Sequence, residues 1–360
     1  MTYVSEVAGA QRDTPDRSRT GHNGGPVNLP LPRDVSELLF LEPHGPDTFV
    51  GATPQYAWGR IYGGQVIAQG LLAAASTVPD DRPVHSLHAY FILGGRLDEP
   101  VRYEVDRVRN GSSFMTRRVV ARQSYGAILT LEASFQTPEE APDVQTVTAP
   151  TGVPDPEDLA ETGWGWMLER RQVPVTFGTG RALTWVRVDP SVGDGEVMQA
   201  CALALASDTS TVTAVRAAHP AGDVPPERHT EVFMGASLDH AVWFHRPARA
   251  DDWLLMDVTC HSVMGARGLS FGHVFDRDGR HVASIAQEAL LRERRGSAGV
   301  SPHSASMRAR IGTFCRYGMA LPWWSPTKRW SSPLARAAAA RSTTWRAASR
   351  ASGRSAWWSA

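Results

Sequence analysis

The sequence predicts an α+β fold made of two similar units, each with one apolar helix covered by an antiparallel sheet. Residues 65–78 and 197–206 are apolar nearly all round, as helices enclosed by other structure are. Each is followed by segments that alternate with a period of two, which is typical of half-buried strands. A shift of 153 residues lays 98–101 on 251–254, so we interpret the halves as copies of one unit.

The other expected elements follow in chain order. A short amphipathic helix is expected over 34–42 and a strand over 47–51, and Asp194 is expected to cap the second long helix. The expected strands of the first unit cover 84–93, 101–110, 114–123 and 127–136. Those of the second unit cover 181–189, 236–246, 253–261, 268–276 and 281–291.

Composition divides the chain into five parts. We expect a disordered leader over 1–34, the N-terminal unit over 35–138, a linker over 139–160 and the C-terminal unit over 161–292. Residues 293–360 form a tail rich in Arg, Ala, Ser and Trp, and from Arg294 onward it holds twelve Lys and Arg and no acid. A disordered basic tail is the expectation. An anchor to an acidic surface and a product of an altered reading frame are the alternatives.

Charge and cysteine content exclude several classes of protein. Residues 1–293 hold 25 Lys and Arg against 37 Asp and Glu, so the main body offers no basic patch for nucleic acid. Cys201, Cys260 and Cys315 form no CxxC pair, which argues against a disulfide framework or a zinc site. No apolar run reaches the roughly 18 residues of a membrane span, and no signal core precedes the main body. We therefore expect a cytoplasmic protein.

Two polar side chains stand alone in apolar strands and are the first candidates for a site. Asp239 lies in the apolar and aromatic run 237–247, and Gln287 lies in the run 282–291. Burying an ionised carboxylate is costly unless a partner offsets the loss of water. Either both groups are satisfied inside the core, or they share one site with Asp239 as base and Gln287 as its partner. The 153-residue shift puts Ser86 and Ser134 at the matching positions of the first unit.

The first long helix opens with Gly63-Gly64. Glycines let backbone approach whatever lies at the helix N-terminus, where free N–H groups favour negative charge. A tight turn is the alternative interpretation.

Seven ordered motifs resemble the acyl-CoA thioesterase II (TesB-like) family over roughly residues 36–292. They lie at 63–65, 84–91, 109–114, 133–136, 236–240, 243–247 and 286–288. The resemblance implies a double hotdog fold, in which two long helices are each wrapped by an antiparallel sheet. It also implies hydrolysis of acyl-CoA to a free fatty acid and CoA, no metal or redox cofactor, and association into a homo-oligomer.

The resemblance also implies site residues. The family's acid falls on Asp239 and its glutamine on Gln287, and the substrate-binding positions fall on Gly63, Gly64, Gln65 and Arg267. The family's third polar residue is a Ser or Thr, and its place is taken here by Cys260 or His261. Thr259 or Ser262 could supply the hydroxyl instead.

The expected mechanism is general-base hydrolysis. Asp239 would take a proton from a water that Gln287 and the third polar group hold, with backbone N–H groups near Gly64-Gln65 facing the oxyanion. No Gly-x-Ser-x-Gly motif occurs, which argues against a serine hydrolase of the α/β type. A hotdog enoyl-CoA hydratase would pair an Asp with a His, but strand alternation puts Asp239 and His240 on opposite faces. A weakly active or non-catalytic acyl-CoA-binding protein is the third hypothesis.

Overall fold

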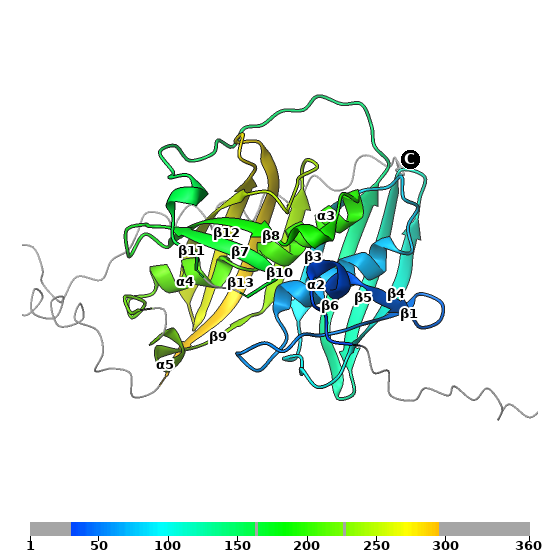
Figure 1. Cartoon of the computed structure of the whole chain (residues 1–360), viewed down its shortest axis with the longest axis horizontal. Helices are drawn as coiled ribbons and strands as arrows, with labels where there is room; N and C mark the ends of the chain where they lie inside the picture. The colour runs from blue at the N-terminus through cyan, green and yellow to red at the C-terminus, as the bar shows by residue number, and fades with distance from the viewer. Residues whose placement is uncertain (1–29, 163–164, 226–227, 295–360) are drawn as a thin grey trace, which may run out of the picture. The chain divides into compact units, whose positions relative to one another are not determined.

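The computed structural model describes residues 30–162, 165–225 and 228–294. Apart from a few residues at their inner ends, the leader expected over 1–34 and the tail expected over 293–360 lie outside the described residues. Within them the strands form a single antiparallel sheet whose long helices lie on one side (Figure 1). The strand order is β1-β2-β4-β5-β6-β3-β10-β13-β12-β11-β8-β7, and β9 also pairs with β13.

The first unit follows the expected elements closely. It comprises α1 (Val35–Leu39), β1 (Leu41–Pro43), β2 (Thr48–Gly51), α2 (Gly63–Ala75), β3 (Val84–Phe91), β4 (Val101–Asn110), β5 (Phe114–Gln123) and β6 (Gly126–Gln136).

The second unit repeats the helix and sheet with additions. It comprises η1 (Pro156–Asp158), β7 (Leu168–Val173), β8 (Arg181–Val188), η2 (Pro190–Val192), α3 (Glu196–Ser207), α4 (Thr211–Ala218), α5 (His229–Val232), β9 (Phe233–Ser237), β10 (Asp239–Phe244), β11 (Leu254–Met264), β12 (Arg267–Phe275) and β13 (His281–Glu293). The strand expected over 236–246 is divided at Leu238 into β9 and β10. Asp194 is not the N-cap of α3, because Gly195 holds that position and Asp194 pairs with Arg249 instead.

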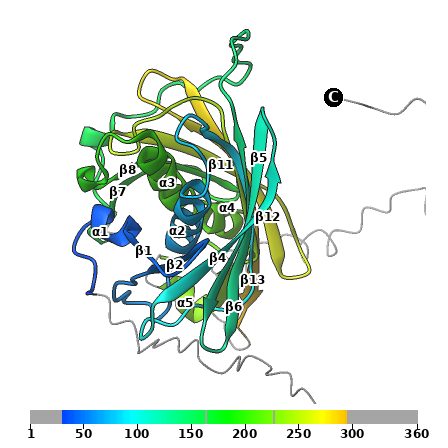
Figure 2. The ribbon, with the colours of Figure 1, turned by 90° about the vertical axis from the view of Figure 1, so that its right-hand side faces the viewer.

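The two units join through strands β3 and β10, which pair antiparallel in the middle of the sheet. Val242 lies opposite Leu87 and His240 lies opposite Ala89. The long helices α2 and α3 pack against each other on the inner face of this sheet (Figure 2). Both are rich in buried alanine, which allows a close approach of their backbones. Each fully buried leucine or isoleucine on them contributes about 2–3 kcal/mol to folding.

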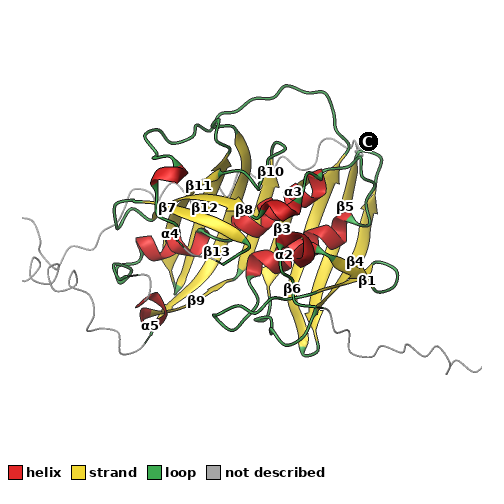
Figure 3. Ribbon diagram, in the orientation of Figure 1, coloured by secondary structure: helices red, strands yellow, loops and turns green. Residues whose placement is uncertain are grey.

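The segment between the units is a long loop that crosses from the first unit to the second (Figure 3) and packs against the second. Its side chains Val147 and Val153 pack on a second core cluster that includes Trp185 and Trp253. The indole N–H of Trp185 donates to the carbonyl oxygen of Pro154 at 3.0 Å. The residues expected to act only as a linker therefore also bury apolar surface.

In the part of the chain that the structure describes, no helix is long and apolar enough to cross a membrane.

Candidate active site

The N-terminus of α2 meets the C-terminus of α3, and the carboxyl group of Asp208 lies between them. Asp208 is the C-cap residue of α3, and the backbone N–H of Gly64 donates to its carboxylate. A Cβ on Gly63 would lie 2.7 Å from the carboxylate oxygen Oδ2, and one on Gly64 would collide with the carbonyl oxygen of Leu205. The group that approaches Gly63-Gly64 closely is thus a side chain of the protein, and their predicted role in binding substrate stays a prediction.

A β-bulge brings further polar groups to the same face of the sheet. Ser237 pairs with Ala289, whereas Ala241 pairs with Ala286, so β9 and β10 use one more residue than β13 over this stretch. An extra residue in one strand interrupts the alternation of faces. Ser237 and His240 consequently lie on the inner face together, beside Gln287.

These side chains form one chain of hydrogen bonds. The Ser237 hydroxyl donates to Asp208 Oδ1 at 3.3 Å, and Gln287 Nε2 donates to Ser237 Oγ at 2.8 Å. Gln287 also hydrogen-bonds the Asp208 carboxyl group. Behind the amide, His240 Nδ1 lies 2.5 Å from Gln287 Oε1, and His240 Nε2 lies 2.7 Å from Ser207 Oγ.

Burial determines the electrostatics of this cluster. Loss of water raises the pKa of Asp208 to about 7, although hydrogen bonds from Gln287, Ser237 and Gly64 favour the ionised form. Asp208 as a whole keeps part of its surface accessible to solvent. Burial lowers the pKa of His240 to about 4, so its imidazole is neutral at pH 7. A carboxylate that titrates near neutral pH, hydrogen-bonded to an amide and a hydroxyl, can serve as a general base.

Comparison with known proteins finds one family in both halves. The acyl-CoA thioesterase N-terminal domain matches residues 52–136, and the C-terminal domain of the same family matches residues 138–291. The chain belongs to the acyl-CoA thioesterase family. The resemblance inferred from the seven motifs is confirmed.

Individual relatives cover most of the described chain. Acyl-coenzyme A thioesterase 8 of Homo sapiens is 33% identical over 291 residues, which are 72% of this chain and 88% of that protein. Acyl-CoA thioesterase 2 of Haemophilus influenzae is 30% identical over 290 residues, 72% of this chain and 97% of that protein.

Solved structures of similar proteins share the fold. Acyl-CoA thioesterase II TesB2 from Mycobacterium marinum is 35% identical with a TM-score of 0.62, covering 73% of this chain and 98% of that one. A protein from Alicyclobacillus acidocaldarius described as having a hot dog fold is 20% identical with a TM-score of 0.59, covering 72% of this chain and 97% of that one. These structures and the two packed helix-and-sheet units confirm the double hotdog prediction.

In this acyl-CoA thioesterase the structure does not bring Asp239 and Gln287 together. Asp239 lies opposite Tyr90 on the outer face, and its Oδ1 accepts from the backbone N–H of Glu288 at 2.6 Å. Gln287 is buried on the inner face, where it contacts His240 instead. The strand register is the physical reason, since Ala241 lies opposite Ala286 and the continued register puts His240, not Asp239, opposite Gln287.

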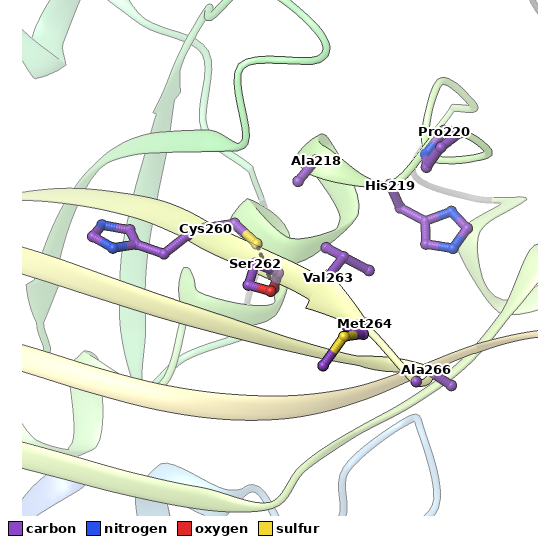
Figure 4. Close-up of a pocket in the computed structure, with 10 residues that line it drawn as sticks. Ala218, His219, Pro220, Cys260, Ser262, Val263, Met264 and Ala266 are labelled. Atoms are coloured by element: carbon purple, nitrogen blue, oxygen red, sulfur yellow. Dashed lines mark hydrogen bonds between the residues drawn. The ribbon is translucent and has the colours of Figure 1, made fainter. Parts of the chain in front are cut away.

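The residues predicted to replace the family's hydroxyl line a different feature. Cys260, His261 and Ser262 border an open hollow of about 530 Å³ between β11 and the end of α4 (Figure 4). Cys260 Sγ donates to the carbonyl oxygen of Ser262 at 3.4 Å, and burial raises the pKa of the Cys260 thiol.

None of these residues contacts the amide of Gln287 among the hydrogen bonds of the described residues. Cys260 lies opposite Ser270, which lies opposite Gln287, so two strand spacings of about 5 Å each separate the thiol from the amide. Thr259 lies opposite Phe271 on the outer face. The hydroxyl that reaches the cluster comes instead from Ser237.

Two of the predicted substrate-binding residues have structural partners. Gln65 is fully buried, where its Oε1 accepts from the Tyr56 hydroxyl at 2.7 Å and its Nε2 donates to the carbonyl oxygen of Ala52 at 3.1 Å. Arg267 is exposed in the hairpin between β11 and β12 and pairs with Glu288 at 2.8 Å.

The first unit lacks this cluster, and Arg117 takes up the corresponding space. Continuing the strand registers places Leu87 and Ala133 where the second unit has His240 and Gln287, so Ser86 matches Asp239 as the 153-residue shift predicts, whereas the predicted match of Ser134 with Gln287 is off by one residue. The buried Arg117 guanidinium donates to Thr77 Oγ1 at 2.7 Å and to the Thr77 carbonyl oxygen at 3.0 Å. It thus satisfies polar groups just beyond the C-terminus of α2.

Sequence reasoning missed Asp208 and Ser237. A detectable signal was the polar run 207–210, which ends an otherwise apolar helix and contains an acid with no neighbouring cation in sequence. Ser237 carried no such signal, because its face depends on the bulge at Leu238. Among the described residues, no group of three or more His, Cys, Asp and Glu side chains has an arrangement that could hold a metal ion.

Proposed function

We propose that the protein hydrolyses acyl-CoA to a free fatty acid and CoA, with Asp208 as general base. The observation that carries the proposal is the cluster of Asp208, Ser237 and Gln287 at the N-terminus of α2. Membership of the acyl-CoA thioesterase family supports the choice of a thioester substrate.

In the proposed reaction the Asp208 carboxylate takes a proton from a water that the Ser237 hydroxyl and the Gln287 amide hold. The resulting hydroxide attacks the thioester carbonyl carbon, and the carbonyl oxygen becomes an oxyanion. Apart from the N–H of Gly64, which faces Asp208, and that of Val66, which bonds the Tyr62 carbonyl oxygen, the backbone N–H groups of the first turn of α2 are the donors that we assign to it. The C–S bond then breaks, and Asp208 returns its proton to the departing CoA sulfur.

Hydratase chemistry has weaker support in this geometry. It would require an imidazole with a free nitrogen facing the substrate, but both ring nitrogens of His240 already have partners. The three cysteines without a CxxC pair favour a reducing compartment, such as the cytoplasm, as the place of the reaction.

The experiment compares Asp208→Asn with Asp239→Asn, measuring release of free CoA thiol from acyl-CoAs of several chain lengths. We expect Asp208→Asn to lower kcat/KM by about a hundredfold or more, because an amide cannot accept the proton. Asp239→Asn should stay within about threefold of the wild type, because the side chain faces away from the cluster. Substantial turnover by Asp208→Asn would refute the assignment, and binding of acyl-CoA without turnover by the wild type would refute the activity.

The pH dependence gives a second readout. Only the ionised carboxylate can act as base, and the pKa of Asp208 is about 7. The value of kcat/KM should therefore fall about tenfold per pH unit below pH 7. A flat profile down to pH 5 would contradict Asp208 as the base.

A further inference from the structure

We propose that His240 is a positioning residue that fixes the orientation of the Gln287 amide, so that the amide N–H groups face Ser237 and Asp208. The inference rests on the proposed function, since it concerns the same cluster. It assigns a task to a buried imidazole that does not itself reach the carboxylate. His240 and Gln287 are each 1% exposed, so water does not compete for their contacts.

An amide side chain can occupy the same space in two orientations that differ by a half turn. In one, Gln287 Nε2 faces Ser237 Oγ at 2.8 Å and Oε1 faces His240 Nδ1 at 2.5 Å. In the other, the amide oxygen would face the Asp208 carboxylate, where two acceptors repel. A proton on His240 Nδ1 selects the first orientation. This N–H needs an acceptor, and of the two amide groups of Gln287 only the oxygen Oε1 can accept.

The opposite ring nitrogen determines where that proton sits. A neutral imidazole carries one N–H, and burial keeps His240 neutral by lowering its pKa to about 4. Ser207 Oγ lies 2.7 Å from His240 Nε2 and can donate its hydroxyl proton there. With Nε2 accepting, the single ring proton is on Nδ1.

The result is a chain in which every donor points toward the carboxylate. The Ser207 hydroxyl donates to His240, His240 to Gln287, Gln287 to Ser237 and to Asp208, and Ser237 to Asp208. Buried hydrogen bonds in series polarise one another in the same direction. The chain thus favours the ionised base and holds its donors in one arrangement.

The first unit supports the coupling of imidazole and amide. At the matching positions it has Leu87 and Ala133, both buried and apolar, beside an α2 C-terminus that carries no acid. The imidazole is therefore present where the amide and the carboxylate are present. Leu87 also shows that a leucine fits at this place in a sheet of the same fold.

The charged and titratable groups around the chain are few. The Tyr62 phenol, which precedes α2, interacts with Asp208 and has its own pKa raised by burial and by that carboxylate. From α3, β9 and β13 the groups facing Asp208 and His240 are the uncharged side chains of Ser207, Ser237 and Gln287. A change in the acid limb of the pH profile would therefore report on the hydrogen-bond chain.

The test uses three substitutions of His240 in the full chain. His240→Leu removes both ring nitrogens, His240→Asn retains a donor near the place of Nδ1, and His240→Gln retains one near the place of Nε2. For Leu and Gln we expect kcat to fall about 10- to 100-fold with KM within about threefold, because a misplaced amide no longer orders the water. The Asn variant should recover most of kcat.

The fall of activity at low pH, the acid limb of the pH profile, should shift in the same variants in which kcat falls. In the Leu and Gln variants Asp208 loses a fixed donor to its ionised form, so the limb should shift to higher pH, and in the Asn variant it should stay near that of the wild type. The thermal midpoint of each variant reports folding. If His240→Leu does not fold, the difference in kcat and pH profile between His240→Asn and His240→Gln tests the inference.

Three results would overturn the inference. These are wild-type kcat and pH profile in His240→Leu, equal losses in all three variants with no shift of the acid limb, and an Asn variant no better than the Gln variant. Asp208→Asn separates this failure from that of the proposed function. If Asp208→Asn is inactive while His240→Leu behaves as wild type, only the role of His240 is refuted.

Discussion

Asp208→Asn should abolish turnover and at the same time stabilise the fold above neutral pH. The carboxyl group has a pKa of about 7 in the folded protein, raised by burial, against about 3.9 in an unfolded chain. Between these values the folded state binds one more proton than the unfolded state. Stability therefore falls as pH rises from about 4 to 7, and the loss is complete above the folded pKa.

The size of the effect follows from the shift. About three pKa units at about 1.4 kcal/mol each give roughly 4 kcal/mol of destabilisation at pH 8. Because Asp208 is partly accessible to solvent, this is an upper value. Asparagine has nearly the same shape, its one amide oxygen can still accept from Ser237, and it is never ionised. The corresponding rise in thermal midpoint would be roughly 10 °C at pH 8.

The assay is urea or thermal unfolding of wild type and variant at pH 4, 6 and 8. The free energies of unfolding should agree at pH 4 and diverge with rising pH in favour of the variant. Asp47→Asn is the control, and it should lower the free energy of unfolding at pH 8 instead of raising it. The hydrogen bond with Arg107 lowers the pKa of Asp47, so the ionised form stabilises the folded state. A variant that is less stable than wild type at pH 8, or a difference independent of pH, would refute the reasoning. The expected result would mean that the ionised Asp208 carboxylate lowers the stability of the fold and is kept because activity requires it.

Three further substitutions test other parts of the structure. Ser237→Ala removes a donor to Asp208 and an acceptor for Gln287, so kcat should fall about tenfold in the thiol-release assay; unchanged kcat would exclude Ser237 from the site. Arg117→Met leaves the polar groups of Thr77 without a buried donor and should lower the free energy of unfolding in urea by about 3 kcal/mol, while the activity of the folded fraction stays constant. Gly64→Ala places a methyl group against the carbonyl oxygen of Leu205 and should lower both the thermal midpoint and kcat; a variant with wild-type values would show that α2 and α3 need not meet closely there.

The elements of the fold were largely predictable because their signals are local. The all-round apolar runs predicted α2 and α3, and period-two alternation predicted β4 and β5 with the bounds that the structure has. The seven motifs predicted the family and, through it, the double hotdog architecture. Gly63-Gly64 predicted the approach of a negative group to a helix N-terminus.

The composition of the site was decided by tertiary structure. Gln287 was a candidate because an amide in an apolar strand is visible in sequence, whereas Asp208 follows the end of an apolar helix and was not among the candidates. The helices α2 and α3 had to pack before that end could face the Gly63-Gly64 turn and lose its water.

The faces of β9 and β10 show the same limit of sequence reasoning. Strand alternation put His240 on the opposite face from Asp239, and the family resemblance assigned Asp239 to the side of Gln287. One extra residue at the junction of the two strands gives that side to Ser237 and His240. The sequence by itself determined which segments are helix and strand and which family they resemble. Only the packed sheet decided which polar groups meet, because a bulge and a contact between helix ends depend on partners far away in the chain.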